Sequence, residues 1–304
     1  MRPLQNSSGD LVLDRRAGFA AVLARDKDFV AAAEVMADAL ELAPRWVAGW
    51  QLLGDYRAEA GDRAGAMAAY RQVETLDPGG TFGARLKLAA QGADATGGGT
   101  DIAYVTALFD EYAGRFEREL TEGLGYAVPP VLGQMIGHLL AGRRVGRAVD
   151  LGCGTGLMGI EVRPLCERLE GVDLSQKMLA EARRKGIYDR LERAEAIEFL
   201  RANPGEIGLI TAADVAIYIG PLPPLLAAAL AALAPGGLFG FSLELHDGAG
   251  TLLQRRQLRY AHNAEEALAE SRGAGFEIVT SLRMGIRRER GVPVDGLVVL
   301  LRKP

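Results

Sequence analysis

Three glycines at alternate positions, Gly152, Gly154 and Gly156, give the stretch VDLGCGTG its chemical signature. An apolar run precedes them and a helical pattern follows, so they are predicted to form the turn between a strand and a helix. In a parallel sheet, such a turn brings the backbone close to a nucleotide-like ligand at the carboxyl ends of the strands. Gly152 allows the tight turn, Gly154 removes a side chain where the ligand approaches, and Gly156 opens the helix without crowding the strand.

Two aspartates and a leucine narrow the choice of ligand. Asp173 ends the next apolar run, 21 residues after Gly152, where a carboxylate can accept hydrogen bonds from ribose hydroxyls. Asp150 precedes the first glycine, which suits a cationic ligand and disfavours pyrophosphate. A dinucleotide site needs a small residue at the sixth position counted from Gly152, and that position is Leu157. The pattern therefore favours S-adenosylmethionine, with its sulfonium and ammonium groups, over a nicotinamide or flavin dinucleotide.

From Arg147 onward, short apolar runs alternate with helical segments of about a dozen residues. The expected strands are 147–153, 169–174, 207–215, 236–245, 276–284 and 294–303, and the expected helices are 157–169, 175–186, 224–233 and 264–275. This alternation predicts an α/β fold with a doubly wound parallel sheet. No helix separates the last two strands, so they are predicted to form an antiparallel pair at one edge.

The glycine loop, the following GVDLSQKMLAEAR and three later segments resemble the class I S-adenosylmethionine-dependent methyltransferases over roughly residues 101–304. The later segments are AEAIEFL in the third-strand region, LITAADVAIYIG at the fourth strand and LAPGGLFGFSLE leading into the fifth. The resemblance implies a seven-stranded Rossmann-like sheet, S-adenosylmethionine as methyl donor and no required metal. It implies these cofactor-binding residues: Tyr112, Asp150, Gly152, Cys153, Gly154, Gly156, Asp173, Leu174, Met178, Glu195, Ala196 and Asp214.

The resemblance also implies a role for each polar residue in this set. Asp150 is expected near the methionine amino group, directly or through water, and Asp173 on the ribose hydroxyls, while Leu174 and Met178 flank adenine. Glu195 stands where the family often has an aspartate that contacts the adenine amino group. Cys153 is interpreted as a small loop residue and not as a nucleophile.

The acceptor side is expected after the fourth and fifth strands. Methyl transfer from a sulfonium is an in-line displacement, so the protein chiefly aligns the acceptor, excludes water and removes a proton where the acceptor carries one. The catalytic candidates are His262, Asp214 and Tyr218, and the substrate candidates are Glu244, His246, Arg259 and Tyr260. His262 could serve as a base near neutral pH or as a structural residue.

The segment FDEYAGRFEREL, residues 109–120, resembles the lid of this family and lies on a helix expected over 101–120. Phe109, Tyr112, Phe116 and Leu120 share one helical face. Such an aromatic stripe is usually core. As a lid, it would bring Tyr112 to the methyl donor.

Residues 13–88 repeat when shifted by 34 positions, which aligns Ala32 with Ala66, Asp28 with Asp62 and Phe19 with Leu53. The second copy resembles the tetratricopeptide repeat, although Arg57 stands where that pattern prefers tyrosine. The predicted domains are a small all-α repeat domain (1–91), a glycine-rich linker (92–100) and a methyltransferase domain (101–304). The repeats are interpreted as a scaffold, as a means of self-association or as a site for a protein partner.

Composition and residue spacing disfavour several other classes of protein. The 35 basic and 39 acidic residues give a net charge of −4, and the basic run RMGIRRERG is interpreted as a solvated strand end, so nucleic acid is not expected. Two cysteines and three histidines without ligand spacing predict no disulfide framework and no metal site. No signal peptide or membrane span is recognised, so a cytoplasmic protein is expected.

Three functions follow. The first is a methyltransferase for a small molecule, the second a protein or peptide methyltransferase whose repeats present the target, and the third a non-catalytic adaptor that binds the cofactor.

Overall fold

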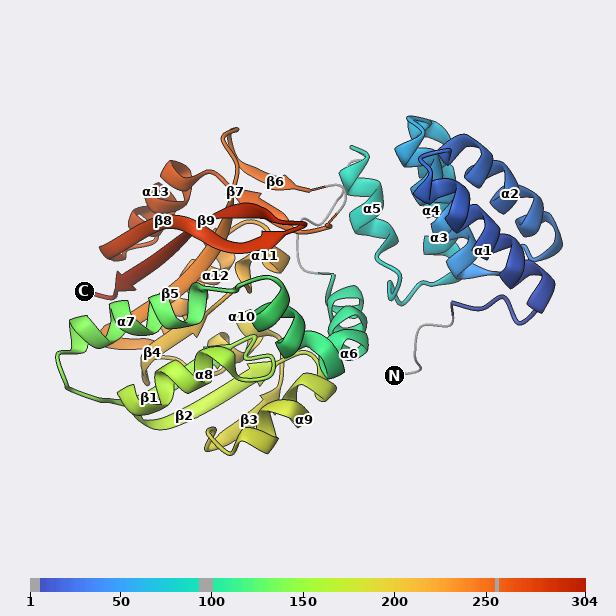
Figure 1. Cartoon of the computed structure of the whole chain (residues 1–304). Helices are drawn as coiled ribbons and strands as arrows, with labels where there is room; N and C mark the ends of the chain where they lie inside the picture. The colour runs from blue at the N-terminus through green and yellow to red at the C-terminus, as the bar shows by residue number, and fades with distance from the viewer. Residues whose placement is uncertain (1–5, 93–100, 255–256) are drawn as a thin grey trace. The chain divides into compact units, whose positions relative to one another are not determined.

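The computed structural model describes residues 6–92, 101–254 and 257–304, without the side chains of residues 121 and 122. Contacts between residues divide the chain into two compact units (Figure 1). The first contains the described residues up to Gly92 together with Ala103–Ala107, and the second contains Leu108–Gln254 and Arg259–Pro304. The predicted linker, 92–100, lies outside the described residues except for its first glycine.

Helices in consecutive pairs build the first unit. They are α1 (Leu11–Arg25), α2 (Phe29–Leu42), α3 (Val47–Glu59), α4 (Arg63–Leu76) and α5 (Ala84–Ala90). The 34-residue period is visible in their caps. Asp28 begins α2 by accepting the backbone N–H of Ala31 over 3.1 Å, and Asp62 begins α4 by accepting that of Gly65 over 2.9 Å.

Gly54 sets the distance between α3 and α4. A Cβ atom at this position would overlap the ring of Tyr70, which is buried and donates its hydroxyl hydrogen to Asp55 Oδ1 over 2.8 Å. Ala20, 34 residues earlier, is also fully buried. The repeat therefore keeps a small residue where its two helices cross.

The substitution Gly54→Ala is expected to destabilise the first unit by about 1–3 kcal/mol, because the new methyl group must displace the Tyr70 ring. Gly18→Ala in α1 is the matched control. Nothing lies within 4 Å of a Cβ at Gly18, and alanine is the better helix former, so stability should rise by about 0.5–1 kcal/mol. Urea unfolding followed by circular dichroism measures both changes, and an unchanged Gly54→Ala transition would contradict this packing.

Within the described part of the chain, the second unit contains a nine-stranded mixed sheet with helices on both faces (Figure 1). Its strands are β1 (Val145–Leu151), β2 (Cys166–Asp173), β3 (Arg190–Arg193), β4 (Ile207–Ala212), β5 (Leu233–Leu245), β6 (Thr251–Leu253), β7 (Tyr260–His262), β8 (Glu277–Glu289) and β9 (Val292–Arg302). The order β3-β2-β1-β4-β5 is parallel. β9 pairs antiparallel with β5, and β8 with β9, which confirms the predicted antiparallel pair.

Two helices of the second unit precede its first strand, α6 (Ile102–Arg118), of which Ala103–Ala107 group with the first unit, and α7 (Val128–Leu140). The others lie between strands and are α8 (Leu157–Val162), α9 (Gln176–Lys185), α10 (Ala196–Arg201), α11 (Ala216–Ile219), α12 (Pro223–Ala232) and α13 (Ala264–Gly273). A π-helical turn, Glu119–Gly123, follows α6, and a 3-10 turn, Arg163–Leu165, follows α8.

Two apolar clusters hold the sheet between its helix layers. Val149 and Ile210 belong to the cluster that includes residues of α12 and α13, whereas their neighbours Ala148 and Leu209 belong to the cluster with α7 and α8. Alternate residues of β1 and β4 therefore serve opposite faces, as a pleated strand requires.

Two sequence predictions are wrong in detail. The helix expected over 157–169 ends at Val162, because Pro164 lacks an N–H and would clash with the preceding turn, and Cys166 begins β2 instead of lying on a helix. The segment AEAIEFL, assigned to the third strand, lies mostly on α10, and β3 precedes it. The Ser175 cap and the Gly186 stop of α9 are confirmed.

Candidate functional site

The glycine loop joins β1 to α8 and has the backbone that only glycine adopts readily. Gly152, Gly154 and Gly156 have φ angles of 57°, 52° and 94°. A Cβ atom at Gly152 would lie 2.5 Å from Val215 Cγ2, so this residue also has to be small. The N–H of Cys153 donates to the carbonyl of Val172 over 3.0 Å, which ties the loop to β2.

Asp173, at the carboxyl end of β2, anchors the same loop. One carboxylate oxygen accepts the N–H of Gly154 over 2.9 Å and the other accepts the N–H of Ser175 over 2.8 Å. Burial raises the pKa of Asp173 to about 6, against the lowering effect of these two hydrogen bonds. This carboxylate lies where the sequence places the ribose-binding acid.

Asp150 is buried beneath the loop with both oxygens engaged. Tyr188 donates its hydroxyl hydrogen to one oxygen over 2.7 Å, and Thr211 donates to the other over 2.9 Å. Burial raises the pKa of Asp150 to about 7. Each carboxylate oxygen keeps a second lone pair beyond these bonds, so the contact of Asp150 with a methionine amino group, directly or through water, stays a prediction. Cys153 is buried too, and burial raises the pKa of its thiol well above the usual value.

The segment 109–120 packs over the loop. The Ser175 hydroxyl donates to Asp110 Oδ1 over 2.6 Å, and Lys185 forms an ion pair with Glu117 at 2.9 Å. Phe116 Cε1 lies 3.6 Å from the Cβ position of Gly154, so its ring covers the glycine turn. Tyr112 packs edge-on against Phe116 with ring centroids 5.5 Å apart. Its hydroxyl donates to Glu119, and burial and this bond raise its pKa to about 12.

The residues expected around adenine lie where β2 and β3 end. Met178 is fully buried on α9, and the carbonyl of Leu174 accepts a hydrogen bond from Arg193 Nε over 3.0 Å. Glu195 caps α10 by accepting the N–H of Glu198 over 2.8 Å, and Ala196 is the first residue of that helix. Glu195 therefore has a structural role as a cap.

Asp214, after β4, belongs to a buried ionic network that the sequence did not reveal. It has a positive φ of 56° and is held by the Ser242 hydroxyl at 2.9 Å and by Arg287 Nη1 at 2.8 Å. Burial raises the pKa of Asp214, and the charge of Arg287 opposes this rise. Arg287 also contacts Glu244 at the end of β5 and donates from Nε to Glu289 over 3.1 Å.

Arg259 completes this network. Its Nε atom lies 2.8 Å from Glu244, and its guanidinium also contacts Glu289. The second Glu244 oxygen accepts a hydrogen bond from Gln254 over 3.1 Å. Two of the four substrate candidates, Glu244 and Arg259, thus pair with one another, and each has a further ionic partner, Arg287 for Glu244 and Glu289 for Arg259.

The remaining candidates lie on neighbouring segments. Tyr218 of α11 packs edge-on against Phe109 with centroids 5.3 Å apart, and Tyr260 packs on Gly220. His246 is half-buried, and its ring contacts its own loop, accepting the N–H of Gly248 over 3.1 Å and lying 2.9 Å from the carbonyl of Gly250. His246 therefore stabilises a turn.

His262 is buried on β7 with one ring nitrogen unpartnered. Nε2 lies 2.7 Å from the carbonyl oxygen of Gly220, so Nε2 carries the hydrogen and Nδ1 keeps its lone pair. Nδ1 has no hydrogen-bond partner among the described residues, and burial lowers the pKa of the imidazole. His262 is therefore neutral at pH 7 and can accept a hydrogen.

Residues 149–239, from the glycine loop into β5, match the family model described as methyltransferase domain. This match identifies residues 149–239 as a methyltransferase domain. Two curated relatives are ubiquinone biosynthesis O-methyltransferases. The Thiobacillus denitrificans protein is 30% identical over 107 residues, which cover 34% of this chain and 45% of the relative. The Bordetella pertussis protein is 34% identical over 108 residues, which cover 34% and 43%.

The chain thus spans less than half the length of these two relatives. Among solved structures, the 1,6-didemethyltoxoflavin-N1-methyltransferase of Burkholderia thailandensis is 20% identical, with a TM-score of 0.50 over 66% of this chain and 88% of that one. This likeness shows a shared Rossmann-like fold. In the methyltransferase domain, the sheet is mixed because its edge strands are antiparallel.

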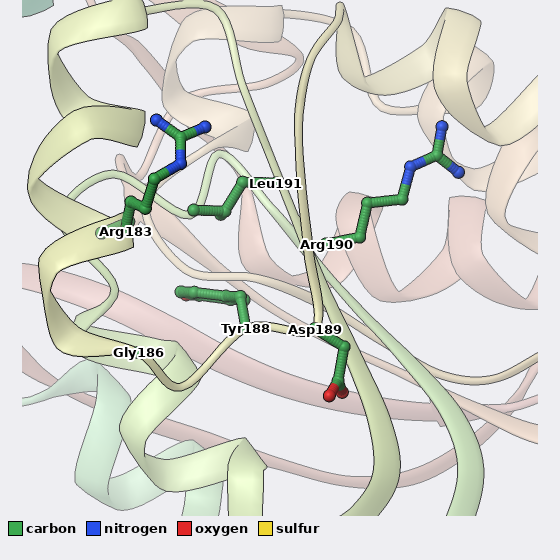
Figure 2. Close-up of a pocket in the computed structure, with 7 residues that line it drawn as sticks. Arg183, Gly186, Tyr188, Asp189, Arg190 and Leu191 are labelled. Atoms are coloured by element: carbon green, nitrogen blue, oxygen red, sulfur yellow. The ribbon is translucent and has the colours of Figure 1, made fainter.

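A cavity of about 140 Å³ lies elsewhere in the methyltransferase domain, beside the end of α9 and the start of β3 (Figure 2). Its lining includes Arg183, Tyr188 and Arg190. The two guanidinium groups point to different sides and do not converge on one point (Figure 2). The Tyr188 ring closes this cavity while its hydroxyl reaches Asp150, so the residue has a packing role that its sequence position did not suggest.

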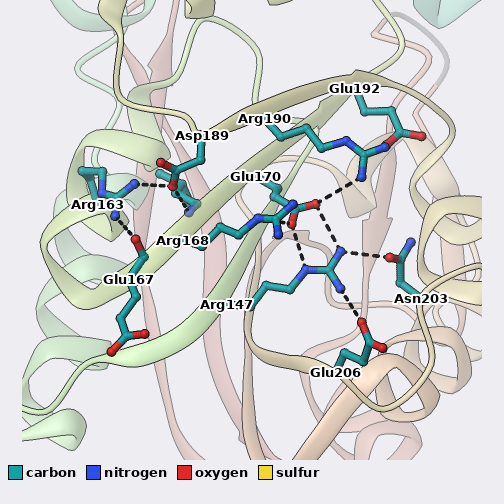
Figure 3. Close-up of polar contacts among 11 residues, drawn as sticks. Arg147, Arg163, Glu167, Arg168, Glu170, Asp189, Arg190, Glu192, Asn203 and Glu206 are labelled. Carbon is teal, nitrogen blue, oxygen red and sulfur yellow. Dashed lines mark hydrogen bonds and ion pairs between the residues drawn. The ribbon is translucent and has the colours of Figure 1, made fainter.

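An arginine cluster around the buried Glu170 joins β1 to β2 (Figure 3). Arg147 donates to both Glu170 oxygens, over 2.9 and 3.1 Å, and Arg168 Nε lies 3.0 Å from one of them. Arg147 also reaches Asn203 over 2.9 Å. These contacts fix β1, which leads into the glycine loop, against β2. Within the described residues, no group of three or more His, Cys, Asp or Glu could hold a metal, and no helix could span a membrane.

The interpretation of RMGIRRERG as a solvated strand end is wrong for Arg287, which is 4% exposed. A shift in the β8–β9 register between Gly285 and Arg287 buries Ile286 and Arg287 in succession. Strict alternation would expose one of them. The sequence offered no signal for this irregularity.

The substitution Arg287→Met is expected to destabilise the methyltransferase domain by about 3–5 kcal/mol, because it leaves Asp214 and Glu244 buried with too little positive charge. Arg283→Met is the matched control on the same strand. Arg283 is exposed and pairs with Asp295 at 2.5 Å, so its loss should leave stability almost unchanged. Chemical denaturation measures both variants. Equal losses would show that the buried network does not stabilise the domain.

Proposed function

We propose that the protein transfers a methyl group from S-adenosylmethionine to a small-molecule acceptor. The observation that carries this proposal is the geometry of Asp173, a buried carboxylate at the end of β2 that accepts hydrogen bonds from the glycine loop and from the start of α9. A ribose at this edge would present hydroxyl donors to that carboxylate. The two curated relatives, both O-methyltransferases of ubiquinone biosynthesis, support a small acceptor.

The residues of the loop fit such a donor. The buried Thr155 hydroxyl has no hydrogen-bond partner among the described residues, so it is available to a ligand. Asp150 and Asp173 place two carboxyl groups beside the loop, which favours a cation over pyrophosphate. When bound, S-adenosylmethionine supplies a methyl group that its sulfonium sulfur has already activated.

The chain's own residues would orient the acceptor and exclude water. Phe116 covers the glycine turn and keeps water from it. Arg287 and Ser242 hold Asp214 in its positive-φ conformation, so its carboxylate has a defined direction toward the acceptor. His262 Nδ1 has a lone pair without a partner, and we assign to it the proton that a hydroxyl or amine acceptor releases.

We further propose that the helices of 1–91 are tetratricopeptide-like repeats, that 92–100 connects them to the methyltransferase domain, and that they act as a scaffold or bind a partner. The second candidate function, methylation of a protein or peptide presented by the repeats, is favoured by the shared cap and crossing positions of the two helix pairs.

Methyl-labelled S-adenosylmethionine separates these functions. The full-length protein is incubated with the small-molecule and the protein fractions of a cell extract in separate reactions, with Asp173→Ala as the background control. We expect label in the small-molecule fraction that depends on Asp173. Label confined to protein bands supports the second candidate. No transfer to either fraction, with the cofactor still bound, supports an adaptor.

The affinity for S-adenosylhomocysteine is expected to depend on the ionisation of Asp173. Asp173→Ala should lose about 1.5–3 kcal/mol of binding free energy, the range for hydrogen bonds to a charged group. In the wild type, the carboxyl has a pKa of about 6, so affinity should fall as pH drops below 6, by up to about tenfold per pH unit for one proton. Calorimetry between pH 5 and 8 measures this slope.

Two variants show which residue causes the pH dependence of S-adenosylhomocysteine affinity. Asp173→Asn should bind with little change over the same range, while Glu167→Gln, an exposed carboxyl at the other end of β2, should keep the wild-type slope. A slope that survives in Asp173→Asn and disappears in Asp150→Asn would transfer the effect to Asp150, whose pKa is about 7.

A further inference from the structure

The first helix of the repeat unit exposes a face that the third helix buries. In α3, the residues Trp46, Gly49, Leu53 and Tyr56 follow helical spacing and are all buried. They pack against α2, where Leu40 Cδ2 lies 3.0 Å from the Cβ position of Gly49. The 34-residue shift carries these four positions onto Val12, Arg15, Phe19 and Val22 of α1.

Among the described residues, no helix of the first unit precedes α1, and the equivalent face of α1 is exposed. Val12 is 59% exposed, Phe19 57% and Val22 44%, and Arg15 is exposed between them. The ends of helical arrays usually carry polar outer faces, because an apolar face there associates with other surfaces. This end of the array is apolar instead.

The other end of the array is closed within the chain. α5 packs on α4, and its Leu88 lies in one apolar cluster with Ala66 and Tyr70 of α4. The 34-residue shift also aligns Gly49, near the start of α3, with Gly83, the residue before α5. The face of α4 that could receive α1 of another molecule is therefore already covered by α5. A head-to-tail array of copies is excluded by this cover, which leaves α1 to pair with the same helix of a second copy.

We propose that the α1 face, residues Val12, Arg15, Phe19 and Val22, is a self-association surface that forms a two-fold dimer with a second copy of this chain. The two α1 helices run antiparallel, so that Val12 lies against Val22 of the second copy and Arg15 against the ring of its Phe19. A cation–π interaction between the Arg15 guanidinium and the Phe19 ring of the second copy explains why an arginine can occupy the centre of this apolar face. This inference is independent of methyl transfer.

Sedimentation velocity on the full-length protein tests the surface. A contact of one helix per copy lies at the small end of protein interfaces, so we expect dimers at about 500 µM that dissociate on dilution to about 5 µM. Phe19→Glu should be monomeric throughout, with an unchanged circular dichroism spectrum because Phe19 is exposed. Leu282→Glu, a similarly exposed apolar residue (45%) on β8, is the control and should still form dimers. A wild type that stays monomeric, or dimers lost in Leu282→Glu but kept in Phe19→Glu, would overturn the proposal.

Crosslinking tests the direction of the helices. Both native cysteines, Cys153 and Cys166, are buried, so an introduced thiol on α1 reacts selectively. In the antiparallel pair, the two copies of position 15 lie about 6 Å apart along the helix axis and the two copies of position 25 about 24 Å apart. A short bismaleimide should link Arg15→Cys as dimers and leave Arg25→Cys unlinked. Efficient linking through position 25 would contradict the antiparallel arrangement.

Discussion

Asp173 accepts a backbone N–H on each carboxylate oxygen, from Gly154 on one side and from Ser175 on the other. These two bonds fix the glycine turn after β1 against the start of α9, and the segment 109–120 is tied to the same helix start through Asp110 and Ser175. The turn, the helix and the covering segment therefore share one anchor. Loss of the carboxylate would release all three.

Burial disfavours the ionised form of Asp173, and the position of this residue at the glycine loop explains why an aspartate is kept there. The folded pKa of about 6 lies above the ordinary aspartate value, so the neutral form is favoured by folding. The stability associated with this shift is present at low pH and is lost as pH rises through 6. An ionised, buried carboxylate at neutral pH is therefore retained against stability, as is common at binding sites. In its ionised form, the Asp173 carboxylate is a strong acceptor for hydrogen bonds from the hydroxyl groups of a ligand.

The acceptor side is organised by a different interaction, the charge of Arg287. This residue comes from the antiparallel hairpin at the edge of the sheet and reaches the ends of β4 and β5, where Asp214 and Glu244 lie. The ends of β4 and β5 thus receive a cationic partner from the last part of the chain. The fold brings these segments together because β9 pairs directly with β5.

The glycine turn and the acid after β2 could be placed from the sequence, but the ionic partners of Asp214 and Glu244 could not. Gly152, Gly154, Gly156 and Asp173 could be predicted because strict spacing and backbone geometry restrict those positions to few residue types. Arg287 could not be predicted, because its burial depends on a register shift in β8 that periodicity does not encode. The position of Glu195 could be predicted but its role could not, since a carboxylate at the start of a helix can either cap that helix or contact a ligand.

We propose that the glycine loop and Asp173 bind S-adenosylmethionine and not a dinucleotide. Isothermal titration calorimetry of the full-length protein with S-adenosylhomocysteine and, separately, with NAD tests it most directly. We expect saturable binding of one S-adenosylhomocysteine per chain and no binding heat with NAD. Saturable NAD binding without S-adenosylhomocysteine binding would contradict it.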